Sequence, residues 1–132
     1  MDKTKYGYSK KVDSSFNKAV EKTKEELKKE GFGVLTEIDI KSTLKTKIDV
    51  DMDNYTILGA CHPQSAYKSI QSEVEIGLML PCNVIVYQNN GDVFVSAIKP
   101  SVAMSMIENE DLGEIAEDIE NRLRSVIDNV HD

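Results

Sequence analysis

The sequence predicts an α+β domain, a five-stranded antiparallel sheet with two main helices on one face. Residues 16–27 and 112–130 repeat apolar side chains at helical spacing. Five shorter segments are rich in β-branched and aromatic residues, and two of them flank Asn90-Gly91, the turn favoured in type I′ hairpins. The segments follow one another in the order β-α-β(4)-α, with short helices inserted between strands. This order is typical of a single sheet covered by helices on one side.

The first half of the chain contains two predicted strands, one long helix and one short helix. Residues 6–12 alternate weakly and indicate a strand at the sheet edge. The helix over residues 16–27 precedes Gly31, a typical helix stop. Residues 32–40 predict a strand whose even-numbered apolar side chains share one face, and residues 40–48 predict the short helix.

The middle of the chain predicts a strand followed directly by a helix. Residues 55–61 form the third strand in this interpretation. The helix covers residues 64–73, and its spacing directs Ala66, Tyr67 and Ile70 inward. This segment therefore joins two strands of the sheet by a structured connection instead of a tight turn.

The hairpin that follows has two apolar faces. Its two-residue turn pairs Tyr87 with Phe94 on one face and Val86 with Val95 on the other. A half-exposed antiparallel sheet normally alternates apolar with polar residues. We therefore expect helices on one side, and a second subunit, a ligand cavity or inserted loops on the other.

Composition and charge narrow the class of protein. The 132 residues are enough for one domain, which we assign to residues 1–132. The net charge is −7, and residues 101–132 hold 9 acidic against 2 basic residues, so we expect no nucleic-acid partner. No apolar stretch has the length of a membrane span, and the first ten residues lack a secretory signal. We therefore expect a cytoplasmic protein that does not bind membranes.

Two cysteines are the main candidates for chemistry. Cys61 ends the third strand and Cys82 begins the fourth, so antiparallel neighbours bring both to one end of the sheet. Three interpretations stay open: buried free thiols, a redox-active or structural disulfide, and ligands of a soft metal, a haem iron or a sulfur compound. Pro63 begins a helix, and a helix N-terminus lowers a thiol's pKa, which favours Cys61 as the more reactive thiol. We expect His62 to be a polar loop residue rather than a ligand or base.

Four stretches of the sequence resemble a known family. GFGVLTEIDI, YTILGACHPQSAYKSI, EIGLMLPCNVIVY and VSAIKP occur in the order found in the domain of unknown function family 302. The resemblance implies a compact α+β domain with a TATA-binding-protein-like arrangement, and small homodimers. It implies no catalytic residues. The family often has asparagine after the first cysteine, so His62 is a departure that argues against a mechanism in which this histidine is essential.

These observations favour a protein that binds a small ligand over an enzyme that converts one. We expect the ligand, a small molecule or a metal or sulfur species, near Cys61, His62 and Cys82 or against the face that carries Tyr87 and Phe94. One alternative is a thiol-dependent redox protein that uses both cysteines, and another is a purely structural dimerisation module. The sequence identifies no cofactor, and it offers too few ligands for a structural zinc site. The expected partners are a second copy of the chain and a small molecule.

Overall fold

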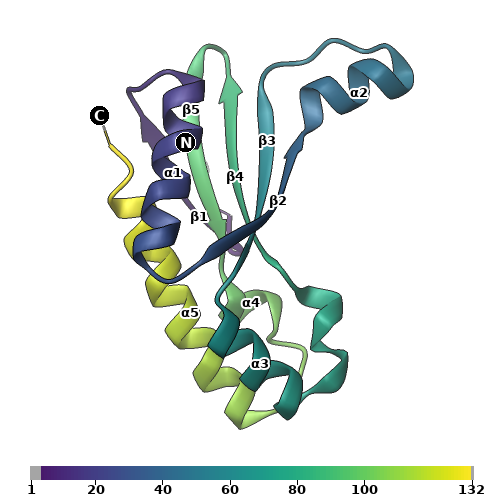
Figure 1. Ribbon diagram of the computed structural model, residues 1–132, viewed down its shortest axis with the longest axis vertical. Coiled ribbons are helices and arrows are strands. Elements are labelled where there is room, and N and C mark those ends of the chain that lie inside the picture. The colour runs from purple at the N-terminus through teal and green to yellow at the C-terminus, as the bar shows by residue number, and fades with distance from the viewer. Residues whose placement is uncertain (1–3, 132) are drawn as a thin grey trace.

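The structure is a five-stranded antiparallel sheet with helices α1 and α5 on one face, which confirms the predicted fold class (Figure 1). The computed structural model describes residues 4–131. Within that range no helix combines the length and apolar character needed to cross a membrane. The sheet order is β1-β5-β4-β3-β2. The elements in chain order are β1 (Gly7–Val12), α1 (Phe16–Lys29), β2 (Gly33–Asp39), α2 (Ile40–Ile48), β3 (Tyr55–Cys61), α3 (Pro63–Ser72), the 3₁₀ helix η1 (Val74–Met79), β4 (Cys82–Asn89), β5 (Asp92–Ile98), α4 (Pro100–Ala103) and α5 (Glu110–Asp128).

The β4–β5 hairpin has the predicted register. Val86 is opposite Val95 in the ladder. Asn90 and Gly91 have φ angles of 53° and 87°, the left-handed conformation that both central residues of a type I′ turn adopt. The prediction is confirmed here because a tight turn fixes strand register through local chemistry alone.

The main core lies between the sheet and the helices α1 and α5. Each helix presents one apolar stripe, and the sheet presents the alternate residues of β3, β4 and β5. Lys10 on β1 holds the end of α5, since its Nζ donates to the carbonyls of Asp128 and Val130 at 3.0 and 2.9 Å. Completely buried members of this core include Leu27, Leu58, Val84, Val86, Val95, Leu123, Val126 and Ile127.

Strand β2 departs from the predicted alternation. Its register against β3 shifts between Val34 and Thr36, so a β-bulge places Leu35 outside the regular ladder. Val34 then packs against the main core, whereas Ile38 is 42% exposed. The predicted common face of this strand is therefore wrong, because one extra residue reverses the side-chain alternation.

A second, smaller core lies beyond the end of the sheet, where α3, η1 and α4 pack beside the first part of α5 (Figure 1). Ile76, Met104 and Leu112 are buried in it. Tyr67 of α3 was predicted to face inward, but it is 65% exposed, so that prediction is wrong. The buried residue of α3 is Ser69, because a small side chain allows this helix to lie close to α5.

Gly31, between α1 and β2, is expected to be required for stability. It has φ of 86°, and a Cβ atom there would lie 3.1 Å from Nε2 of His62. We predict that Gly31→Ala lowers the free energy of unfolding by about 1 kcal/mol or more, because alanine is strained at positive φ. Urea denaturation measures this change.

The matched control is Gly113→Ala in α5. No atom lies within 4 Å of a Cβ built there, and the residue has helical surroundings. Alanine at this position is expected to raise the free energy of unfolding by up to about 1 kcal/mol. Equal effects of the two substitutions would contradict the assigned role of Gly31.

Candidate functional site

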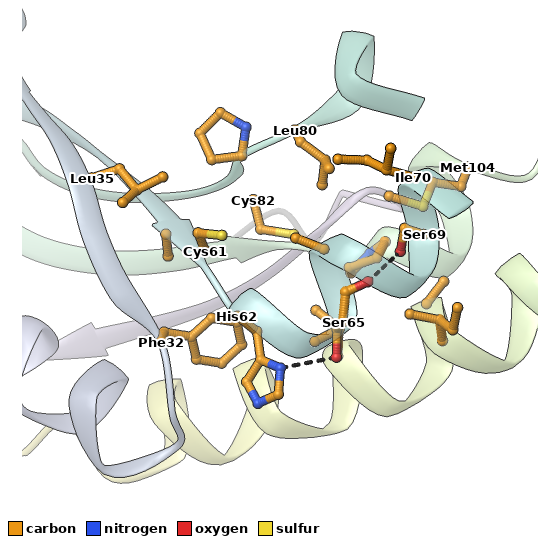
Figure 2. Close-up of a pocket in the computed structure, with 17 residues that line it drawn as sticks. Phe32, Leu35, Cys61, His62, Ser65, Ser69, Ile70, Leu80, Cys82 and Met104 are labelled. Atoms are coloured by element: carbon orange, nitrogen blue, oxygen red, sulfur yellow. Dashed lines mark hydrogen bonds between the residues drawn. The ribbon is translucent and has the colours of Figure 1, made fainter. Parts of the chain in front are cut away.

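A cavity lies at the end of the sheet where β3 and β4 meet α3 and α5 (Figure 2). Its volume is about 300 Å³. Small-molecule sites span roughly 300–1,000 Å³, so the cavity matches the smallest of them. The apolar wall includes Phe32, Leu35, Ile70, Leu80, Met104 and Ile119.

Small side chains on three elements create this space. Ala60 on β3, Ala66 and Ser69 on α3, and Ala116 on α5 all line the cavity. The hydroxyl of Ser69 donates to the Ser65 carbonyl at 2.7 Å, so its polar atom is satisfied within the helix. The cavity is partly open to solvent, so water or a small ligand can enter it.

Cys61 and Cys82 lie next to each other at this cavity, as predicted (Figure 2). Ala60 is opposite Cys82 in the β3–β4 ladder, which puts Cys61 one residue beyond that pair. Both cysteines are free thiols; Cys61 is half-buried, and Cys82 is 8% exposed. Burial raises the pKa of Cys82 from 9.0 to about 11, with a smaller contribution from Cys61. Cys82 is therefore protonated at neutral pH.

His62 adds a neutral polar group to the same wall. It is the N-cap of α3, and its Nδ1 is hydrogen-bonded to the Ser65 hydroxyl at 2.9 Å. Its ring packs edge-on against Phe32 with a centroid distance of 5.5 Å. Burial lowers the pKa of His62, and the nearby charge of Arg122 lowers it further. Among residues 4–131, no three or more His, Cys, Asp or Glu side chains gather as a metal-binding group.

Tyr87 and Phe94 lie on the opposite face of the sheet and do not line the cavity. Tyr87 stacks between Tyr55 and Phe94, with centroid distances of 5.7 and 5.2 Å. They alternate along their strands with core residues, so they point away from α1 and α5. The structure thus divides the predicted site residues into two groups. We call the second group, with its neighbours on the same side of the sheet, the open face; it is formed by Tyr55, Ile57, Ile85, Tyr87 and Phe94.

The two cysteines of the cavity were predictable from the sequence, but most of the other residues that line it were not. Ser65 and Ser69 have i, i+4 spacing on α3 with Ala66 between them, so a face of small residues was visible in the sequence. Met104 and Ile119 gave no such signal. They reach the cavity only because α4 and α5 pack against the same region, a contact between distant parts of the chain.

The fold and the site define a small α+β domain with paired thiols beside an apolar cavity. The family model described as Domain of unknown function DUF302 matches residues 8–130, and the chain belongs to this family, as the resemblance implied. A similar solved structure is that of the uncharacterized conserved protein DUF302 from Bacillus stearothermophilus. It has a TM-score of 0.91 and 34% sequence identity, and the match covers 96% of this chain and 99% of that chain. No curated protein matches this sequence.

The thiol of Cys82 is expected to make stability fall at high pH. The folded protein holds this proton up to a pKa of about 11, whereas the unfolded chain loses it near 8.5 to 9. The stabilisation is complete below the unfolded pKa and is lost as the pH rises through the folded one. Relative to Cys82→Ala, the wild type should lose about 2 kcal/mol of unfolding free energy between about pH 8 and 10.5. Urea denaturation in reductant at both pH values checks this, and a constant difference would contradict the burial of Cys82.

Proposed function

We propose that this protein binds a small, largely apolar molecule in the cavity between α3, α5 and the β3–β4 end of the sheet. The observation that supports this is the cavity of about 300 Å³ with apolar walls and a few polar groups along one side. Cys61, His62, Ser65 and Cys82 are among these polar groups. Apolar pockets with few convergent polar groups are typical of ligand sites. Free thiols also fit the reducing cytoplasm that the sequence predicts.

The walls of the cavity are suited to binding without large rearrangement. Ala60 belongs to a central strand, and Ala116 and Ile119 belong to α5, whose inner face is buried in both cores. A site that is formed before the ligand arrives avoids the entropy of ordering side chains and loops during binding. The neutral imidazole of His62 supplies polarity without a buried charge that a ligand would need to neutralise.

Filling the cavity is expected to abolish binding while the fold is kept. In Ala66→Leu, a good helix former adds three carbon atoms that project into the cavity. We predict that the dissociation constant of indole, used as a compact apolar probe, rises by about tenfold or more, which corresponds to about 1.4 kcal/mol. NMR titration of the protein with indole measures the constant.

Tyr67→Leu is the matched control for this experiment. It introduces the same side chain at the next position of α3, which is 65% exposed. Indole should bind this variant with wild-type affinity. The proposal is overturned if indole leaves the signals of the cavity residues unchanged in the wild type, or if both variants weaken binding equally.

A second candidate function is formation of a homodimer through the open face. This face has apolar and aromatic side chains, and its charged neighbours Lys11 and Asp92 pair with each other at 3.5 Å. The net charge of −7 opposes self-association elsewhere, and α5 carries many of the acids on the other side of the sheet. A neutral apolar face is therefore the surface at which two identical copies meet with the least repulsion. A stable interface needs about 800 Å² from each partner, an area that a sheet face can supply.

A charge placed in the centre of the open face should separate such a dimer. Ile85→Lys is expected to change the mass found by light scattering from that of two chains to that of one. A symmetric interface would bury the lysine ammonium group of both copies, so the desolvation penalty would count twice. The control is Gln71→Lys on the exposed surface of α3, which should stay dimeric. A monomeric wild type at about 100 μM, well above typical dissociation constants of stable dimers, would overturn this candidate.

A further inference from the structure

The two thiols of the cavity differ in their surroundings. Cys61 ends β3 and is half-buried, so reagents that enter the cavity reach it. Cys82 begins β4, is 8% exposed, and lies among the residues of the main core. The structure therefore pairs one accessible thiol with one that is almost completely enclosed by protein.

We propose that Cys61 carries a small thiol compound as a mixed disulfide, taken from a low-molecular-weight disulfide whose organic group is apolar. This inference rests on the proposed ligand site, because the cavity is the space that would receive the organic group. The residues that line the cavity are apolar or neutral, and among them are Phe32, Leu35 and Leu80 (Figure 2). A charged compound such as glutathione would lose hydration in this space, because no charged side chain among the residues that the structure describes lines the cavity.

The reaction is a thiol–disulfide exchange that needs no other oxidant. The thiolate of Cys61 attacks one sulfur of the compound R–S–S–R, a bond forms between Sγ and that sulfur, and the original S–S bond breaks. The departing RS⁻ takes up the proton that Cys61 released and leaves as RSH. Cys61 and the bound sulfur form the new disulfide, and the departing sulfur is the one that is reduced.

The protonation state of Cys82 explains why the adduct would persist. Resolution of a mixed disulfide requires a second thiolate, which attacks Sγ of Cys61 and expels RSH. Burial raises the pKa of Cys82 to about 11, so its side chain stays protonated at pH 7 and offers very little attacking thiolate. Exchange at Cys61 is therefore expected to be fast relative to formation of a Cys61–Cys82 disulfide. The site would hold the thiol compound until an external thiol removes it.

Intact-mass spectrometry tests the proposal on the reduced full-length protein at pH 7. Dipropyl disulfide and glutathione disulfide are the two reagents, and each rate is divided by that of the same reagent with free cysteine. We expect one propylthio adduct on the wild type and on Cys82→Ser, and none on Cys61→Ser. The corrected rate for dipropyl disulfide should exceed that for glutathione disulfide by about tenfold or more, since the cavity buries the propyl chain.

Three results would overturn the inference. They are an adduct on Cys82, a dominant product two hydrogens lighter that contains the Cys61–Cys82 disulfide, and equal corrected rates for the two reagents. Indole binding to the reduced wild type separates this inference from the proposed ligand site. If the wild type binds indole and forms no adduct, the ligand site stands and the covalent step is wrong. If the wild type does not bind indole, the ligand site itself is wrong.

Discussion

The pairing of β3 with β4 is the constraint on which both surfaces of interest depend. At one end of this ladder Tyr55 is opposite Tyr87, which builds the aromatic stack of the open face. At the other end Ala60 is opposite Cys82, which brings the two thiols to the cavity. A shift of one residue would reverse the faces of β3 relative to the core. The same register therefore fixes the cavity, the open face and the inner residues of the central strands.

Burial on the helical face explains why this register is stable. Leu58 on β3 and Val84 on β4 are opposite each other and completely buried. Moving either strand by one residue would place such side chains on the open face, at a cost of about 1.5–3 kcal/mol for each large side chain. Lys10 on the outer strand β1 reinforces the arrangement, because its Nζ donates to the carbonyls of Asp128, the last residue of α5, and of Val130. The packing of the helices and the order of the strands are thus parts of one cooperative structure.

Local chemistry made most of the fold predictable from the sequence, whereas the cavity depends on distant contacts. The turn at Asn90 and Gly91 determines its hairpin, and helical periodicity determines α1 and α5, each within a short segment. The bulge at Leu35 was not predictable, because an extra residue in a strand leaves no clear mark on the apolar pattern. The cavity wall unites α3 with Met104 and α5, and the sequence contains no local record of that contact. The two thiols were predictable because a cysteine is recognised from the sequence alone, whereas a packing contact between distant segments is not.

The connection between β3 and β4 explains why the cavity lies at this end of the molecule. Antiparallel neighbours need only a short turn, yet residues 62–81 form α3, η1 and the segment that returns to β4. The connection between β2 and β3 is also extended, but its helix α2 buries no residue. Only the first of these connections meets α5, which supplies an opposing wall. A rigid sheet that carries an irregular connection beside its last helix is an arrangement suited to function, because the sheet fixes the site while the connection shapes it.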